Sequence, residues 1–345
     1  MYRKLFGRKS LLLAVLLVMS GSLLNFAQAD EVNVYSARKE ALILPLLQRF
    51  KADSGIGFNL ITAKADELLK RLEAEGRSTP ADVFITTDAG RLQRAKEAGV
   101  LRAVDNPLLN ARIPKNLRDQ DNHWFGLSQR ARVIFYAKDR VDPGELSTYE
   151  ALADAKWQQR VCIRSSGNIY NQSLVASMIE ADGVEKTEAW ARGLVANLAR
   201  NPAGGDTDQL RAAAAGQCDV AIANTYYYGR LVNSDKEADR AVAGALGLFW
   251  PNQADRGAHI NVSGAAVTLH AKHPEAAERL LEFLASAESQ TWYGEVNIEY
   301  PVVADAQTSA LLKSFGEFKS DSLNLSRLGE NNRAAVQLMD RAGWR

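Results

Sequence analysis

The sequence has few cysteines, histidines and prolines and almost no excess of charge of either sign. It holds 2 Cys, 4 His and 9 Pro in 345 residues, and 42 Lys and Arg nearly balance 41 Asp and Glu. Two cysteines are too few for a disulfide-rich scaffold, and 46% hydrophobic residues exclude a disordered or collagen-like chain. A formal charge of +1 gives no electrostatic reason to expect a nucleic-acid partner. An α/β protein remains, and its length favours two domains.

Residues 1–29 have the order of a secretory signal peptide. Four basic side chains come first, at Arg3, Lys4, Arg8 and Lys9. The apolar run 11–24 follows, and the segment ends in Ala27-Gln28-Ala29. We predict cleavage after Ala29. An uncleaved anchor is the alternative, but the apolar run is too short to cross a bilayer comfortably.

The chain that remains after cleavage is mildly acidic. It holds 38 Lys and Arg against 41 Asp and Glu, a formal charge of −3. No later segment approaches eighteen uninterrupted apolar residues, so we expect a monomeric periplasmic protein that is not membrane-embedded. Outside the cytoplasm, Cys162 and Cys218 are candidates for a disulfide that closes a long loop, which chain-entropy arguments value at roughly 4 kcal/mol. Two buried free thiols are the alternative.

Short apolar runs alternate with longer amphipathic stretches from residue 30 onward, which is typical of strands and crossover helices. In the first series we expect strands at 32–35, 57–62 and 82–85 and helices at 41–51, 66–75 and 91–98, with Pro45 kinking the first helix. In the second we expect strands at 132–136, 160–164, 218–223 and 264–269 and helices at 148–154, 169–181, 208–215 and 274–287. No Pro/Ser-rich linker separates the series, so two domains should share several crossings and enclose a cleft.

The most unusual local feature is the run Asn224-Thr225-Tyr226-Tyr227-Tyr228, which directly follows a predicted buried strand. Asn224 or Thr225 can cap a helix that begins there. Tyr226 and Tyr227 then lie in its first turn, at the carboxyl end of a strand, where ligands of open α/β sheets bind. The partial positive charge of the helix N-terminus favours phenolate over phenol.

A second strand-to-helix junction, residues 164–173, places Tyr170 in a similar position. Its hydroxyls and the free backbone amides of the first helical turn are the groups that bind an anion at a helix start. Three tyrosines at two such junctions suggest a hard, highly charged cation, and ferric iron fits best because three phenolates cancel its charge. Metal affinity should then fall as the pH drops. A packing or sugar-stacking surface is the alternative.

These segments resemble those of the periplasmic ferric-iron-binding proteins of bacterial ABC transporters, the bacterial transferrins. The resemblance covers residues 30–345 and rests on four segments: residues 34–38, residues 80–84, residues 165–173 and residues 224–228. The last two are the more specific. The resemblance implies a type II, two-lobed periplasmic-binding-protein fold, with mixed sheets flanked by helices and a ligand cleft between the lobes. We expect residues 30–133 and 258–306 in lobe 1, and residues 134–257 and 307–345 in lobe 2.

The resemblance also implies a ligand set, in which Tyr170, Tyr226 and Tyr227 bind Fe(3+). Many family members have a His or a His-Tyr pair after the first strand, but this chain has Arg38-Lys39-Glu40 there. Arg38 is therefore expected to hold a synergistic anion such as carbonate, with a salt bridge as the alternative role. Ser166 and Asn171 are the other anion-binding candidates. Tyr35, Glu40 or water is left to complete the iron shell.

Arg130 and Arg132 flank the expected interdomain crossing, where they either support the anion or pair with acids. The expected function is capture of ferric iron and delivery to an inner-membrane ABC permease, without catalysis. One alternative is a solute-binding protein for a small organic or inorganic anion, with the tyrosines as aromatic walls. A secreted hydrolase is disfavoured because the sequence has no G-x-S-x-G elbow, H-E-x-x-H helix or P-loop.

Overall fold

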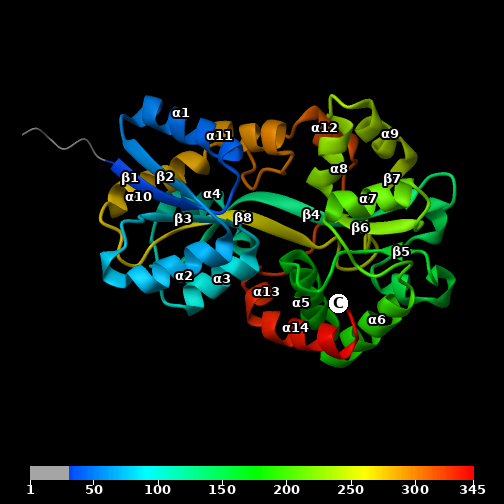
Figure 1. Cartoon of the computed structure of the whole chain (residues 1–345). Helices are drawn as coiled ribbons and strands as arrows, with labels where there is room; N and C mark the ends of the chain where they lie inside the picture. Colours follow the sequence, from blue (N-terminus) through cyan, green and yellow to red (C-terminus); the bar gives the residue numbers. More distant parts are fainter. Residues whose placement is uncertain (1–30) are drawn as a thin grey trace, which may run out of the picture.

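The protein folds as two lobes joined by two long antiparallel strands, β4 (Phe125–Ala137) and β8 (Ile260–Val267) (Figure 1). The structure is a computed structural model that describes residues 31–345. The predicted signal peptide and its cleavage site after Ala29 lie outside the described residues. The strands form an eight-stranded sheet in the order β2-β1-β3-β8-β4-β6-β5, with β7 paired to β4.

The first lobe is built on three parallel strands: β1 (Glu31–Ser36), β2 (Gly57–Thr62) and β3 (Val83–Thr87). β8 pairs antiparallel with β3. Val83, Phe84 and Ile85 are all buried, as expected for a strand covered on both faces. The helices are α1 (Leu44–Ser54), α2 (Ala65–Glu75), α3 (Ala89–Glu97), α4 (Pro107–Arg112), α10 (Pro274–Leu284) and α11 (Ala287–Trp292).

The second lobe continues the sheet through β5 (Val161–Cys162), β6 (Val220–Asn224) and β7 (Leu246–Phe249). Its helices are α5 (Ile169–Asp182), α6 (Val184–Ala196), α7 (Asp206–Ala214), α8 (Thr225–Val232) and α9 (Glu237–Ala245). A disulfide joins Cys162 to Cys218, with the Cα atoms 5.9 Å apart. The predicted pairing of the two cysteines is confirmed, and the alternative of free thiols is not.

β4 belongs to both lobes. Its residues from Phe125 to Ala131 pair with β8, and from Arg132 onward it pairs with β6 and β7. The change of partner between Ala131 and Arg132 marks where the chain passes from one lobe to the other. The side chains next to this point are therefore close to both lobes.

The C-terminal segment contains α12 (Ala310–Ser314), α13 (Ser326–Glu330) and α14 (Asn332–Arg341). α13 packs against α3 of the first lobe and α5 of the second, between which it lies in Figure 1. The contact with α3 is close, because a Cβ atom at Gly329 would come within 2.2 Å of the Gln93 side chain. The segment therefore contacts both lobes.

Most predicted elements agree with the observed ones to within a few residues, but several differ, among them the strand predicted at 264–269, which is β8 and begins at Ile260. The helix expected at 41–51 is split into a 3-10 turn, Glu40–Leu42, and α1, so that Pro45 stands at the start of α1 instead of kinking a longer helix. The helix expected at 148–154 is a 3-10 turn, Glu150–Ala153. The strand expected at 132–136 is the second half of β4, and the helix expected at 274–287 ends at Leu284.

The remaining short elements are the 3-10 turns Gly76–Ser78, Lys115–Leu117, Pro143–Glu145 and Ala155–Trp157 and the π-turn Tyr293–Asn297. Within residues 31–345, no helix combines the length and the apolar character that crossing a bilayer requires.

Candidate functional site

Two strand-to-helix junctions of the second lobe bring three tyrosines together. Asn224 ends β6 and Tyr226 and Tyr227 follow in the first turn of α8. Asn168 caps α5 by accepting a hydrogen bond from the Tyr170 backbone N–H at 3.1 Å, which places Tyr170 in the first turn of that helix. The Tyr226 hydroxyl donates to the Tyr170 hydroxyl at 3.4 Å. The rings of Tyr226 and Tyr227 have their centroids 4.3 Å apart.

The three tyrosines line one cavity of about 150 Å³ between the lobes. The first lobe contributes Arg38, Lys39 and Thr87 to its wall, and the second lobe contributes the tyrosines and Arg230. Arg130 of β4 and Glu299 also line it. The sequence prediction that Tyr170, Tyr226 and Tyr227 share a cleft site is consistent with this geometry.

Arg130 is buried and lies against two of the tyrosine rings. Its guanidinium carbon is 5.2 Å from the Tyr170 ring centroid and 5.9 Å from that of Tyr226. Burial raises the pKa of the Tyr170 phenol, but the positive charge of Arg130, the hydrogen bond from Tyr226 and the charge of Arg91 together outweigh burial, and the net shift of the pKa is downward. Tyr170 is therefore the phenol best prepared to ionise.

The other two tyrosines have the opposite tendency. Burial and the neighbouring phenols, Tyr170 above all, raise the pKa of Tyr226 well above its ordinary value. The pKa of Tyr227 is also raised, by burial first, then by Tyr170 and Asp206. Bringing three phenolates this close requires a compensating positive charge, which a bound cation can provide.

Arg132 connects the two tyrosine junctions. Its guanidinium donates to the Asn224 side-chain oxygen at 3.0 Å, to the Asn171 side-chain oxygen at 2.6 Å and to Asp206 at 3.0 Å. Arg130 and Arg132 were each expected either to support the anion or to pair with acids. Arg132 pairs with an acid, Asp206, whereas Arg130 lies in the cavity wall. Asn224 occupies the N-cap position of α8, one of the two residues expected there, but its side chain makes no capping hydrogen bond.

Arg38 forms a buried ion pair with Glu299. Its two terminal nitrogens lie 2.9 and 3.2 Å from the two carboxylate oxygens, and one of them also donates to Ser263 at 2.6 Å. Burial raises the pKa of Glu299, but the charges of Arg38 and Arg130, together with hydrogen bonds from Arg38 and Ser128, outweigh it and lower that pKa to about 2. The salt bridge considered as the alternative for Arg38 is present, although Arg38 also lines the cavity.

Ser166 and Asn171 lie outside the set of residues that line the cavity. The Asn171 amide nitrogen donates to the backbone oxygens of Arg164 and Ser165, at 2.8 and 3.1 Å, and its oxygen accepts from Arg132. Ser166 accepts a hydrogen bond from Gln172 through its backbone oxygen. The hydrogen bonds of Asn171 therefore hold the 164–173 junction together. The positive charge at the cavity comes from other residues, among them Arg38 and Arg130.

Two candidates for completing a metal shell are not in the cavity wall. The Tyr35 hydroxyl donates to Glu75 at 3.0 Å, and burial together with Glu75 raises its pKa to about 12. Glu40 is exposed in a 3-10 turn. Tyr228, the third tyrosine of the run, packs on Phe135, and its hydroxyl donates to the Ala243 backbone oxygen at 3.2 Å.

Sequence reasoning missed Lys39, Thr87 and Arg230 as wall residues. Arg230 lies over the Tyr226 ring at 4.9 Å. Its position four residues after Tyr226 on one helix was the signal that could have found it, because side chains at this spacing share a helix face. Lys39 precedes the 3-10 turn Glu40–Leu42 and Thr87 ends β3, both in the other lobe, and no local pattern joins them to the tyrosines.

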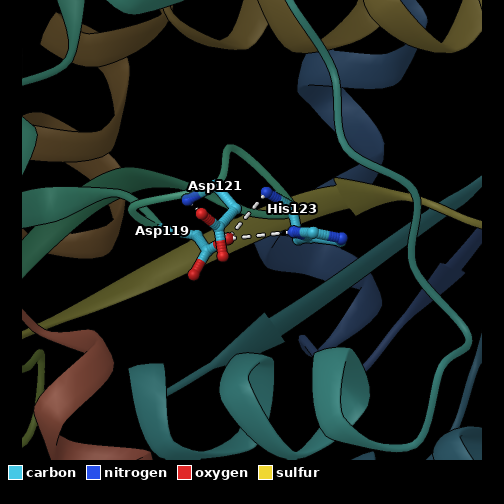
Figure 2. Close-up of side chains that lie close together, drawn as sticks. All are labelled: Asp119, Asp121 and His123. Atoms are coloured by element: carbon cyan, nitrogen blue, oxygen red, sulfur yellow. Dashed lines mark hydrogen bonds and ion pairs between the residues drawn. The ribbon is translucent and has the colours of Figure 1, made fainter.

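A second group of metal-ligand side chains, Asp119, Asp121 and His123, lies in the loop before β4 (Figure 2). Asp119 accepts from the backbone N–H of His123 at 3.0 Å and lies 3.1 Å from its Nδ1. The Lys96 ammonium contacts Asp119 at 2.9 Å and Asp121 at 2.8 Å. The lysine supplies the positive charge that these carboxylates need, so the group is an ion-pair network that closes the loop.

The chain is similar to extracellular solute-binding proteins, among them proteins of iron uptake. The family described as "Bacterial extracellular solute-binding protein" matches residues 35–291. The chain is 48% identical to "Iron uptake protein A1" of Synechocystis sp., over 92% of this chain and 88% of that protein. A solved Trichodesmium structure (IdiA, FutA), in complex with iron and citrate ligands, is 50% identical with a TM-score of 0.89, covering 91% of this chain and 100% of that one. The ferric binding protein from Campylobacter jejuni is 42% identical with a TM-score of 0.86, over 91% of this chain and 100% of that one.

Proposed function

The chain belongs to the bacterial extracellular solute-binding proteins, and from this we propose that it captures ferric iron in the periplasm and delivers it to an inner-membrane ABC permease. In this proposal the protein works as a monomer by capture and release, without catalysis and without a nucleic-acid partner. The names of its relatives support iron as the cargo, since one is an iron uptake protein and another was solved with iron and citrate.

The observation that supports iron binding most strongly is the convergence of Tyr170, Tyr226 and Tyr227 on one interlobe cavity. Phenolate oxygens are hard, anionic ligands, and three of them balance the charge of Fe(3+). Softer metals prefer sulfur or imidazole, which this wall does not offer. Ferric iron is the cation that best compensates three mutually repelling phenolates.

A synergistic anion completes the shell in this proposal. Besides the tyrosines, the wall holds Arg38, Lys39, Arg130 and Arg230, with Glu299 as its acidic residue. Because the tyrosinates alone neutralise the metal, these cations leave an excess of positive charge that fits carbonate or a small carboxylate. Arg38 remains a candidate anion contact at the cavity, whereas Ser166 and Asn171 would need to rearrange to reach it.

The cavity wall also supports a closure mechanism. The tyrosines come from the second lobe, and Arg38, Lys39 and Thr87 come from the first, so the site is complete only when the lobes are close together. Iron and anion bound to both walls would stabilise the closed arrangement, and the permease could distinguish loaded from empty protein by that difference.

The test is to express residues 30–345, add ferric salt with carbonate, and record the visible spectrum. A ferric tyrosinate absorption band is expected, and it should disappear in Tyr226→Phe and Tyr227→Phe. Tyr228→Phe is the matched control because its hydroxyl contacts the Ala243 backbone oxygen outside the cavity. A colourless protein that binds the anion without iron would contradict the proposal and support the anion-binding alternative.

A further inference from the structure

A hydrogen bond joins the two lobes close to two wall residues of the tyrosine cavity, Thr87 and Tyr170. The Ser173 hydroxyl of α5 donates to the Asp88 carboxylate at 2.7 Å, and both residues are fully buried. Asp88 lies between β3 and α3 in the first lobe, next to the wall residue Thr87. Ser173 lies three residues after Tyr170 on the helix that holds this tyrosine.

We propose that Asp88 is a positioning residue for iron binding, which acts through Ser173 on Tyr170. In this role, which rests on the proposed function, the Asp88–Ser173 bond ties the helix of Tyr170 to the first lobe and keeps that phenol at the interlobe site. Rotation of one lobe about β4 and β8 would pull α3 and α5 apart and break the bond. The bond therefore favours the arrangement in which both lobes line the cavity.

Asp88 is held by several donors in a conformation that is costly for an aspartate. Its φ is 83°, in the region where non-glycine residues are uncommon, and its side chain is buried. One carboxylate oxygen also accepts from the Gly90 backbone N–H at 2.9 Å, and the other accepts from Asn261 at 2.8 Å. The backbone N–H of Asp88 donates to the Val262 backbone oxygen at 2.8 Å. These bonds, all within the first lobe, hold the Asp88 carboxylate in place independently of Ser173.

Two hydrogen-bond partners of Asp88 lie on β8, one of the two strands that join the lobes. Asn261 and Val262 belong to β8, and Asn261 is the register partner of Arg130 on β4. Arg130 donates to the same Val262 backbone oxygen at 3.0 Å and lies against the Tyr170 ring. Two sets of contacts therefore link Tyr170 to β4 and β8. In the first, its ring packs against Arg130, and in the second, Ser173 of the same helix bonds to Asp88.

The helix contact around this bond is close. A Cβ atom at Gly90 would lie 3.6 Å from both Ile169 and Ser173 of α5, so the first turn of α3 rests on the first turn of α5. The residue before Ser173 is held as well, because Asn332 at the start of α14 donates to the Gln172 side-chain oxygen at 3.1 Å. α5 therefore has little freedom to shift while the bond to Asp88 is present.

The Ser173 hydroxyl is not needed to build its own helix, which makes it a clean site for substitution. Its partner is across the interlobe contact, whereas Ser177, one turn later and equally buried, donates to the Leu174 backbone oxygen of the same helix at 2.7 Å. Ser173→Ala leaves Asp88 with its Gly90 and Asn261 donors, so no buried carboxylate is left without partners. Ser177→Ala is the matched control for loss of a buried hydroxyl in α5.

The experiment compares both variants with the unsubstituted protein, each loaded with ferric salt and carbonate. We expect Ser173→Ala to lose iron to excess EDTA about tenfold faster, the effect of losing one hydrogen bond to a charged group. Its thermal midpoint without iron should match that of Ser177→Ala, whose release rate should be unchanged. Equal release rates in the two serine variants would overturn the proposal.

A double-mutant cycle tests whether the effect depends on Asp88. Asp88→Asn should also speed release, and adding Ser173→Ala to it should change the rate by less than Ser173→Ala does alone. Fully additive effects on the release rate would overturn the coupling. Failure of the unsubstituted protein to develop the ferric tyrosinate band would instead overturn the proposed function, and this inference with it.

Discussion

The Tyr226 hydroxyl lies 3.4 Å from the Tyr170 hydroxyl, although the two residues are 56 positions apart and belong to different helices. Both helices begin at the carboxyl end of a strand, and Arg132 bonds to both junctions. Two phenols this close repel each other when both ionise, which is one reason why the pKa of Tyr226 is raised. In the proposed iron site, the bound cation would offset this repulsion.

Tyr170→Phe should weaken ferric binding by more than about 100-fold, because even outer-shell changes at metal sites cost about 10- to 100-fold. The loss removes the phenol that ionises most readily beside Arg130. Competition against a chelator of known affinity measures the effect. A binding constant within the range of the Tyr228→Phe control would remove Tyr170 from the ligand set.

Iron affinity should fall as the pH falls. The raised pKa values of Tyr226 and Tyr227 mean that both phenols are protonated in the empty site at neutral pH and must release protons to bind metal. Each proton released contributes about a tenfold loss of affinity per pH unit of acidification. Titration in weakly buffered solution counts the protons directly, and binding without proton release would contradict tyrosinate ligation.

Arg230→Gln should reduce the dependence of iron binding on added carbonate. Arg230 lines the cavity and lies over the Tyr226 and Tyr227 rings, at 4.9 and 5.9 Å. We expect about a tenfold loss of affinity in carbonate, the order of one charge-assisted hydrogen bond, and a smaller loss without it. Arg240→Gln is the control because Arg240 donates to the Ser234 backbone oxygen outside the cavity. Equal losses with and without carbonate would argue against an anion contact.

Replacing Cys162 and Cys218 together by alanine should lower the free energy of unfolding by about 4 kcal/mol, because the cross-link restricts a long loop in the unfolded chain. Urea unfolding of the iron-free protein measures the change. Iron affinity should be little altered, since neither cysteine lines the cavity. An unchanged urea midpoint would show that the disulfide adds nothing to stability.

Gly329→Ala should destabilise the fold by about 1–3 kcal/mol through overpacking. A Cβ at this position would lie 2.2 Å from the Cβ of Gln93, where α13 meets α3. Gly244→Ala is the matched control in α9, since nothing lies within 4 Å of its Cβ position. Gly329→Ala should unfold at a lower temperature than Gly244→Ala. Equal thermal midpoints would indicate that α13 can shift to make room for the added methyl group.

Local patterns predicted the elements that hold the tyrosines but not all of their surroundings. Tyr226 and Tyr227 directly follow a buried apolar strand, so their place in a first helical turn could be read from neighbouring residues. Arg230 shares their helix and could have been found in the same way. Lys39 and Thr87 come from the other lobe, and their approach to the site depends on how the lobes are placed.

The sequence by itself determined the α/β class and the three tyrosines at two helix starts, because strand and helix periodicity and turn chemistry act over a few residues. It left Cys162 and Cys218 open between a disulfide and two free thiols. Only the tertiary structure decided which charges meet. In the folded protein, Arg38 pairs with Glu299, 261 positions away, Arg132 donates a hydrogen bond to Asn171, and Ser173 donates one to Asp88. Such pairs form where the lobes and crossing strands bring distant side chains into a buried space, where a charge without a partner is too costly to keep.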